Sequence, residues 1–268
     1  MARVDFREPQ VMAIVNVTPD SFYSSSRTFE AESLRERVEQ AVTQGASILD
    51  IGGYSSRPGA DDISMEQEWE RVEMGLRAVQ SVGADVAISI DTFRVEVARR
   101  AYEMVGEVIV NDISGGCDQM YRFVGENSLP YILMHMRGTP QNMQSLAEYD
   151  DVTQSVKEYF EERIERLRSF GVEQIILDPG FGFAKSVEDN YTLMGSLSQI
   201  CSMGYPLLSG VSRKSMIYKV LSTTPEESLT GTIALNWESL RQGATILRVH
   251  DVREASEVVK LFSFYQKI

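Results

Sequence analysis

Eight short apolar segments recur along the chain, and β-branched residues are common in them. Most of them are apolar at nearly every position, as in residues 11–17 (VMAIVNV), and do not alternate with polar residues. Continuous apolar strands are typical of parallel sheets that are covered on both faces. The pattern therefore predicts eight buried parallel strands, at residues 11–17, 46–52, 85–91, 108–112, 131–136, 174–180, 206–212 and 246–251.

Between these strands apolar residues return every three or four positions, which predicts amphipathic helices. In residues 151–170, for example, Val152, Val156, Phe160 and Ile164 form one apolar stripe, with Glu and Arg on the opposite side. Helices are expected at residues 32–44, 66–81, 95–104, 118–126, 151–170, 187–199, 229–242 and 252–265.

Strict alternation of eight strands and eight helices favours an α/β fold of the (β/α)8 TIM barrel type, as a single domain over residues 1–268. An open doubly wound sheet also alternates, but it usually has fewer strands and a glycine-rich turn after the first one. Here Thr18-Pro19-Asp20-Ser21-Phe22 follows the first strand. In a barrel, the long segments 18–31, 53–65 and 137–150 all lie at the carboxyl ends of strands, where active sites are found.

The charge balance argues against one class of function. The chain has 26 Lys and Arg against 39 Asp and Glu, a net charge of −13, which argues against a general nucleic-acid binder. A few cations in one cleft could still bind a small anion. The two cysteines are far apart in the sequence, and no apolar run is long enough to cross a bilayer. With no apolar leader at the start, a cytoplasmic location with reduced thiols is expected.

Polar side chains gather at the carboxyl ends of the predicted strands, although polar groups in buried strands are costly unless they are paired. Capping would explain a few of them, and Asp50 and Asp251 are the candidates for structural roles. The others predict a functional rim. The set consists of Asn16, Asp50, Asp91, Asn111, Asp112, His135, Asp178, Ser212, Arg213, Lys214, Arg248, His250 and Asp251.

The cations of this set point to an anion. Arg248 and His250 are two positions apart, so their side chains share one strand face and can hold a phosphate. Arg213 and Lys214 follow the seventh strand, near which barrels often bind phosphate. Arg213 could instead form a surface ion pair. Lys214 could be a solvated rim lysine or a Schiff-base nucleophile.

The acids and amides suggest a second ligand. Asp91, Asn111 and Asp178 can accept and donate hydrogen bonds to a flat heterocycle that has N–H groups and a ring carbonyl. A buried acid could also bind a metal, but the chain has only 2 His and no spacing typical of a zinc site. Mg²⁺ carried on phosphates would need few protein ligands. The residues alone therefore predict a barrel enzyme whose mouth binds an anion beside a polar heterocycle.

Eight motifs follow the strands in order. They are NVTPDSF at 16–22, DIGG at 50–53 with SSRPG at 55–59, SIDT at 89–92, NDISG at 111–115, LMHM at 133–136 with GTP at 138–140, DPGFGF at 178–183 with Lys185, SRKS at 212–215 and RVHD at 248–251. Together, over nearly the whole chain, they resemble the dihydropteroate synthase family of folate biosynthesis, whose members are pterin-binding TIM barrels.

The resemblance implies that 6-hydroxymethyl-7,8-dihydropterin pyrophosphate condenses with 4-aminobenzoate to give 7,8-dihydropteroate and pyrophosphate. The enzyme would be a transferase of a dihydropterinylmethyl group, would use Mg²⁺, and would be inhibited by sulfonamides, which imitate 4-aminobenzoate. Its partners would be these small molecules, with no nucleic acid and no membrane. Family members commonly form dimers, so a homodimer is expected.

The resemblance also implies a role for each matching residue. Catalytic roles fall to Asp91, Asp178, Lys214, Arg248 and His250. The pterin site comprises Asp91, Asn111, Met134, Asp178, Phe183 and Lys214. The pyrophosphate site comprises Asn16, Arg248 and His250, with Mg²⁺ near Asn16. The 4-aminobenzoate site comprises Ser56, Arg57, Pro58, Phe183, Lys214 and Ser215, and Phe22 is a further loop candidate.

Two segments depart from the family pattern. Tyr23-Ser24-Ser25-Ser26 stands where the family commonly has Ser-Asp-Gly-Gly, and Tyr54 replaces an acid. One alternative is therefore a catalytically silent pterin-binding paralogue. Another is a methyltransferase domain that binds methyl-tetrahydrofolate and passes the methyl group to a corrinoid protein. The motifs at residues 57–59, 212–215 and 248–250 favour the synthase.

Overall fold

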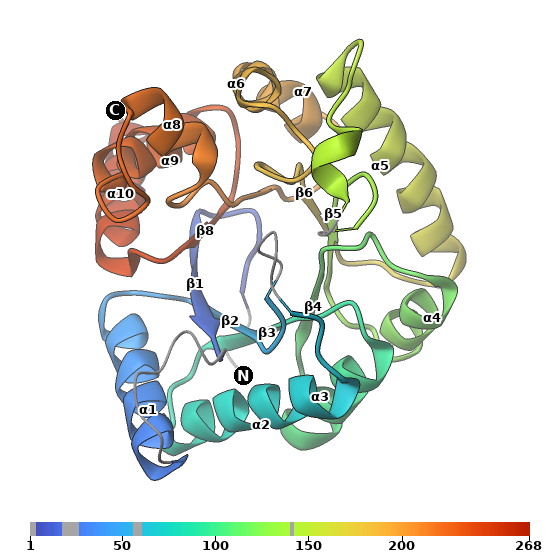
Figure 1. Ribbon diagram of the computed structural model, residues 1–268, viewed down its shortest axis with the longest axis vertical. Coiled ribbons are helices and arrows are strands. Elements are labelled where there is room, and N and C mark those ends of the chain that lie inside the picture. Colours follow the sequence, from blue (N-terminus) through green and yellow to red (C-terminus); the bar gives the residue numbers. More distant parts are fainter. Residues whose placement is uncertain (1–3, 18–26, 56–60, 140–141) are drawn as a thin grey trace.

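The computed structural model describes residues 4–17, 27–55, 61–139 and 142–268. Its strands form one parallel sheet in the order β6-β5-β4-β3-β2-β1-β8-β7, and a bridge between Leu177 and Leu207 joins the two edges. The sheet is thus a nearly closed barrel, and Figure 1 shows the helices arranged around it. This confirms the predicted TIM barrel.

All eight predicted strands are present. The last four strands end two or three residues before the predicted carboxyl end, because the polar residues there belong to loops at the mouth of the barrel. The second, third and fourth strands end where predicted. The strands are β1 (Gln10–Asn16), β2 (Ile48–Gly52), β3 (Ala87–Asp91), β4 (Ile109–Asp112), β5 (Tyr131–Met134), β6 (Ile175–Asp178), β7 (Leu208–Ser209) and β8 (Ile246–Val249).

The predicted helices are also present, with two differences. The expected helix over 187–199 divides at Ser196, directly after Gly195, a poor helix former. The short helix α8 was not predicted, because seven residues are too few to show a clear period. The helices are α1 (Arg27–Thr43), α2 (Met65–Val82), α3 (Val95–Val105), α4 (Asp118–Glu126), α5 (Val152–Ser169), α6 (Val187–Gly195), α7 (Leu197–Cys201), α8 (Ser215–Leu221), α9 (Leu229–Arg241) and α10 (Val252–Tyr265), with a 3₁₀ turn η2 (Met143–Leu146).

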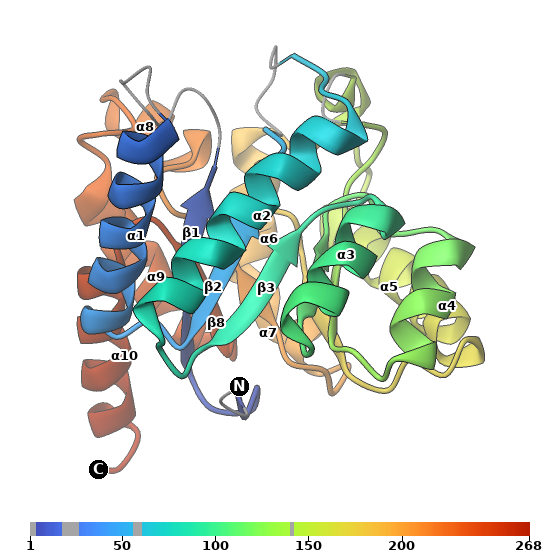
Figure 2. The same cartoon turned by 90° about the horizontal axis from the view of Figure 1, so that it is seen from below.

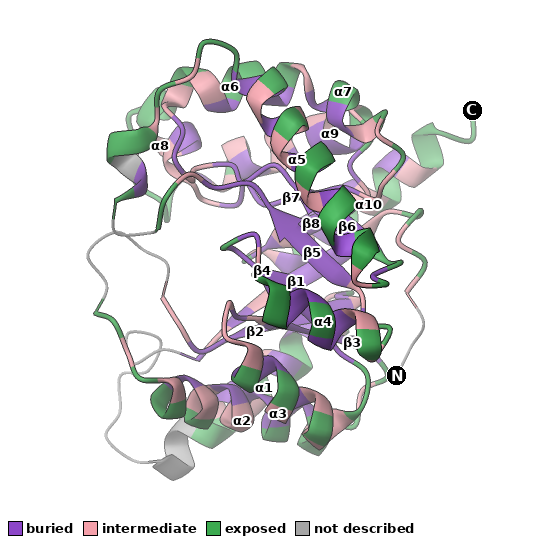
Figure 3. Cartoon of the chain, turned by 90° about the vertical axis from the view of Figure 1, so that its right-hand side faces the viewer, coloured by how far each residue is buried: buried purple, intermediate pink, exposed green. Residues whose placement is uncertain are grey.

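The helices bury their apolar stripes on the outside of the barrel. Val156, Phe160 and Ile164 of the predicted stripe all belong to the main core cluster, and Phe160 has no exposed surface. Figure 3 shows the strands buried and the helices with their exposed sides turned outward. In the described part of the chain, no helix has the length and apolar character needed to cross a membrane.

A separate apolar layer closes the amino-terminal end of the barrel interior. Each strand contributes one side chain to it, and Phe6 packs against the layer. Figure 2 shows the described amino-terminal segment at this end, opposite α8. Because apolar side chains fill the barrel interior at this end, its polar interior positions lie toward the carboxyl ends of the strands. The layer consists of Met12, Ile48, Ala87, Ile109, Ile132, Ile176, Leu208 and Ile246.

Candidate active site

The predicted polar residues occupy the interior positions directly above the apolar floor. Side chains alternate along a strand, so residues two and four positions beyond the floor also point into the barrel. The second layer contains Asp50, Ser89, Asn111, Met134, Asp178 and Arg248. The third layer, at the mouth, contains Asn16, Asp91, Ser212 and His250. Strand alternation thus brings residues from both ends of the chain into one site.

Arg248 lies at the centre of the second layer. Its Nε donates to Asp50 Oδ2 and its Nη2 to Asp91 Oδ2, both at 2.7 Å. Asn111 Nδ2 donates to the same Asp50 oxygen at 3.0 Å, and Asp50 is completely buried. Asp50 therefore has the structural role expected from the sequence. Arg248, which the sequence suggested as an anion-binding cation, is already held by two carboxylates.

Burial and charge act in opposite directions on this group. Burial raises the pKa of Asp91 above its ordinary value, and the positive charge of Arg248 only partly offsets the effect. Burial by itself would lower the pKa of Arg248, but Asp50 and Asp91 more than reverse this and raise it. Arg248 therefore stays cationic, and its charge is matched to the acids around it.

A second set forms where β6 and β7 end. Asp178 Oδ1 accepts a hydrogen bond from Gly180 N at 2.8 Å. Lys214 Nζ donates to the carbonyl oxygen of Phe181 at 2.5 Å and lies 4.7 Å from the centre of the Phe183 ring. Burial raises the pKa of Asp178 and lowers that of Lys214 to about 8, although each is favoured by the other's charge. The predicted group of Asp178, Phe183 and Lys214 is therefore adjacent in space.

Apolar side chains line one side of the mouth. Met134, at the end of β5, is 2 % exposed and clusters with Ile113 and Met136. Phe183 and Phe93 pack against the same cluster. Met134 and Phe183 thus share one apolar wall, as the resemblance implied for the sides of a flat ring.

The remaining cations differ in their surroundings. His250 is exposed at the rim, and its Nδ1 lies 3.3 Å from Ser212 Oγ. Arg213 instead forms two hydrogen bonds with Asp251, at 2.9 and 2.7 Å, and also binds backbone carbonyl oxygens, including that of Pro225. The ion-pair interpretation of Arg213 and the structural role of Asp251 are therefore correct. Arg213 does not share the surroundings of the other rim cations.

Asn16 provides an oxygen at the end of β1. A Cβ atom added to Gly52 would lie 3.5 Å from Asn16 Oδ1 and 3.6 Å from Asp91 Oδ2, so both oxygens border the same point. Within the described residues, no cluster of three or more His, Cys, Asp or Glu side chains could hold a metal ion. One amide oxygen suits Mg²⁺ that keeps most of its ligands from phosphate and water. These residues therefore fit an ion that arrives with a phosphorylated ligand.

Part of the predicted 4-aminobenzoate site lies outside the described residues, namely Ser56, Arg57 and Pro58, as does Phe22. Ser215 is described and begins α8, directly after Lys214. Tyr54, which replaces the acid common in the family, stacks edge-on against Phe93 with the ring centres 5.1 Å apart. Arg94 lies over the Tyr54 ring, 5.4 Å from its centre, so an aromatic contact stands where the family commonly has an acid.

Sequence reasoning missed a buried network at the base of the β2–α2 loop. Glu68 is completely buried in α2 and accepts from Thr92 Oγ1 at 2.5 Å and from Arg94 Nη1 at 2.7 Å. Arg94 Nη2 also donates to the carbonyl oxygen of Ile63, at 2.7 Å. The network fixes the end of the loop that carries residues 56–58. It gives no signal in the sequence, because an acid in the first turn of a helix is usually exposed.

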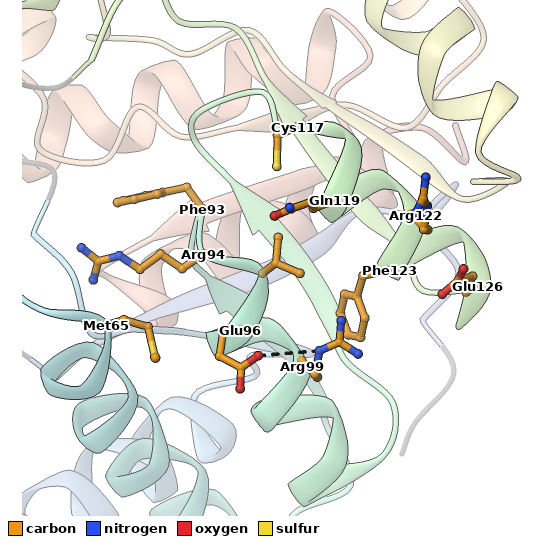
Figure 4. A pocket seen from close by; sticks show the side chains of 11 residues that line it. Met65, Phe93, Arg94, Glu96, Arg99, Cys117, Gln119, Arg122, Phe123 and Glu126 are labelled. Atoms are coloured by element: carbon orange, nitrogen blue, oxygen red, sulfur yellow. Dashed lines mark ion pairs between the residues drawn. The ribbon is translucent and has the colours of Figure 1, made fainter.

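A cavity of about 620 Å³ opens outside the barrel, between α3 and α4. Figure 4 shows Arg99 beside Phe123 on one side of it, with Cys117 and Gln119 on the other. Of the predicted site residues that the structure describes, none lines this cavity. We therefore place the candidate active site at the barrel mouth, where the charged side chains of β2, β3, β6 and β8 meet Lys214.

The chain resembles known proteins over nearly its full length. The model of the pterin binding enzyme family matches residues 12–250. A dihydropteroate synthase from a Synechocystis species is 43% identical over 259 residues, covering 94% of this chain and 88% of that protein.

Solved structures agree with this. The Yersinia pestis dihydropteroate synthase, solved with a sulfonamide drug, has 35% identity and a TM-score of 0.91, and the match covers 99% of this chain and 97% of that one. The Xanthomonas albilineans enzyme, solved with 4-aminobenzoic acid, has 34% identity and a TM-score of 0.88, with 98% and 95% covered. The chain therefore belongs to the dihydropteroate synthase family of pterin-binding enzymes.

Proposed function

We propose that this chain is a dihydropteroate synthase, which joins the methylene carbon of 6-hydroxymethyl-7,8-dihydropterin pyrophosphate to the amine of 4-aminobenzoate. The observation that carries the proposal is the meeting of Asp91, Asn111, Asp178 and Lys214 around Arg248 at one end of the barrel. Membership of the family and the ligands of its solved members support the same activity.

The polar layer suits the pterin ring. Carboxylates such as Asp91 and Asp178 can each accept two adjacent N–H groups, and the amide of Asn111 can donate as well as accept. The three groups lie at interior positions above an apolar floor, so they would recognise the ring through hydrogen bonds to its polar edge. Met134 and Phe183 supply the apolar contacts for its faces.

The reaction breaks the C–O bond to pyrophosphate and forms a C–N bond to the amine, whose nitrogen then loses one proton. As the pyrophosphate leaves, positive charge develops on the methylene carbon and the conjugated ring. Asp91 and Asp178 stabilise this charge because they are already oriented, Asp91 by Arg248 and Asp178 by Gly180. The neutral aromatic amine needs no strong base to attack.

The leaving group needs positive charge on its own side. A guanidinium has five N–H donors, and the two carboxylates bind Arg248 through Nε and Nη2, which leaves donors for a phosphate oxygen. His250 lies at the rim two positions further along. Mg²⁺ bound to the pyrophosphate and to Asn16 would neutralise part of the departing charge.

Replacing Asn16 with Ala should weaken the use of Mg²⁺. The concentration of Mg²⁺ that gives half the maximal rate should rise roughly tenfold, because one oxygen ligand is lost. Calorimetric affinity for the pterin without its pyrophosphate should hardly change. An unaltered Mg²⁺ dependence of the rate would contradict the role given to Asn16.

The rate should also depend on the charge of Lys214. Burial lowers the pKa of Lys214 to about 8, so its positive charge is lost as the pH rises through that value. We expect kcat/KM to fall by about tenfold per pH unit above this pKa. In Lys214→Arg the guanidinium keeps its charge, and the fall should move to higher pH. If both proteins show the same alkaline limb, another group controls it.

The activity itself is tested by incubating the purified chain with the pterin pyrophosphate, Mg²⁺ and 4-aminobenzoate. Release of pyrophosphate together with dihydropteroate is the expected result. A chain that binds the pterin in calorimetry but forms no product would be a silent paralogue. Transfer of a methyl group from methyl-tetrahydrofolate to a corrinoid protein would indicate the methyltransferase alternative.

We keep two further expectations as proposals. The chain should form a homodimer, which light scattering at several concentrations would test. It should reside in the cytoplasm, which fractionation of the source cells would test.

A further inference from the structure

The loop after β6 has an unusual backbone. Gly180, Gly182 and Ala184 all adopt the left-handed conformation, with φ values of 68°, 80° and 47°. Ala184 carries a Cβ atom, for which this conformation is unfavourable. Such a run persists only where surrounding contacts hold it in place. The contacts that hold this loop therefore matter for whatever the loop carries.

The side chain of Lys185 contacts the backbone of this loop and holds it in place. Its Nζ lies 3.0 Å from the carbonyl oxygen of Gly180, 3.1 Å from that of Phe183 and 3.0 Å from His135 Nδ1. Lys185 is only 5 % exposed. An ammonium group has three N–H donors, so these three acceptors match its full capacity.

His135 is the side chain that lies within hydrogen-bond distance of Lys185. It is 2 % exposed and meets the Tyr159 ring edge-on, with the ring centres 4.9 Å apart. Burial, with the nearby charges of Lys185 and Arg137, lowers the pKa of His135 to about 2, so the ring is neutral at any working pH. A neutral ring with its proton on Nε2 presents a lone pair on Nδ1, which is the acceptor that Lys185 needs.

The loop carries Phe183 and contacts Lys214, two groups that the proposed reaction uses. The carbonyl oxygen of Phe181 accepts the hydrogen bond from Lys214 Nζ, and the Phe183 ring lies beside the same nitrogen. A Cβ atom on Gly182 would come within 3.1 Å of Lys214 Cδ, so the lysine stem lies directly on this loop. Any movement of residues 180–184 would therefore move Lys214 and Phe183 as well.

We propose that Lys185 and His135 form a buried positioning pair that fixes the β6–α6 loop and thereby sets the place of Phe183 and Lys214. Neither residue lies in the set that the resemblance assigned to the substrates. Both act through the loop, as positioning residues. The kinetic consequence of this pair rests on the proposed function, because Phe183 and Lys214 border the expected 4-aminobenzoate site.

The test compares four single variants and one double variant with the wild-type enzyme. Lys185→Met keeps the length of the side chain without its donors. His135→Leu removes the acceptor, whereas His135→Asn keeps an acceptor near the place of Nδ1. The matched control is Lys260→Met, which removes an exposed lysine on α10.

Lys185→Met and His135→Leu should each raise the KM for 4-aminobenzoate about tenfold or more, because a small displacement of positioning groups is costly. His135→Asn and Lys260→Met should stay within about twofold of the wild type. The double variant of Lys185→Met with His135→Leu should be no worse than Lys185→Met alone, because that change already removes the contact with His135. If the fold-changes in KM of the two single variants multiply in the double variant, the proposed pair is wrong.

KM also separates positioning from simple loss of structure. Partial unfolding lowers the amount of active enzyme and thus Vmax, but it leaves KM unchanged. If Lys185→Met lowers only Vmax and the melting temperature, the residue is structural and the proposal is wrong.

Hydrogen exchange provides a readout that does not depend on turnover. In Lys185→Met and His135→Leu, backbone amides of residues 180–186 should exchange about tenfold faster or more, and those of the floor strands should not change. Should the wild-type protein form no dihydropteroate while this difference in exchange appears, the proposed function fails and the pair stands. Unchanged exchange in an active enzyme would refute the pair alone.

Discussion

Arg248→Met should produce the largest combined loss of stability and activity. The change removes the cation that binds Asp50 and Asp91 at 2.7 Å each and leaves two buried acids without it. Removing one partner of a buried ion pair typically costs about 3–5 kcal/mol of unfolding free energy. The loss of charge near the leaving group should also lower kcat/KM by about 10²–10³-fold. Chemical denaturation and steady-state kinetics would measure the two effects.

Two further variants separate these effects. In the double variant of Arg248→Met with Asp50→Asn, part of the stability should return, because one uncompensated charge is gone, but the activity should not. Arg213→Met is a matched control, since Arg213 also binds an aspartate, Asp251, but away from the interior layers. It should lower stability without raising either KM. If Arg248→Met folds as stably as the wild type, the described pairing does not support the fold.

Lys214→Met should have an effect of similar size on activity but a small one on stability. Its ammonium contacts Phe181 O and lies beside Phe183, between the expected sites of both substrates. We expect kcat/KM to fall by about 10²-fold or more, with higher KM values for the pterin ester and for 4-aminobenzoate. Unchanged kinetics would refute the place given to Lys214.

The stability of Lys214→Met follows from the direction of its pKa shift. The folded state lowers the pKa of Lys214 to about 8, below the ordinary value of lysine, so at pH 7 folding disfavours its charge. Removing that charge should therefore change the unfolding free energy by no more than about 1 kcal/mol, the worth of one hydrogen bond. Arg248 has the opposite shift, because two acids favour its charged form. Urea unfolding of both variants at pH 7 should show this contrast.

The contrast explains how the barrel keeps an electrostatic site stable. The acids of the second layer are balanced within the protein by Arg248, so that charge contributes to folding. Folding disfavours the charged form of Lys214, which lies next to the mouth. Arg248 thus contributes to folding and to the reaction, whereas Lys214 contributes to the reaction alone.

The sequence by itself determined the barrel and most of the rim. The strands are apolar because both of their faces are covered, and the helices are amphipathic because each buries one face, so both requirements are visible in the order of the residues. Polar residues at the strand ends are also visible in the sequence, because unpaired polar groups are costly in buried strands. The order of residues alone therefore predicts Asp91, Asn111, Asp178, Lys214 and Arg248 as members of the rim.

Only the tertiary structure decided which of these charges meet. Asp50 and Arg248 are 198 positions apart in the sequence, and no local pattern shows that they share a hydrogen bond. Glu68 and Lys185 resemble ordinary exposed charges until packing buries them beside Arg94 and His135. A side chain's partners, its burial and hence its pKa depend on chain segments brought together by folding. The sequence therefore determined which side chains form the mouth, and the closed barrel decided what each of them binds.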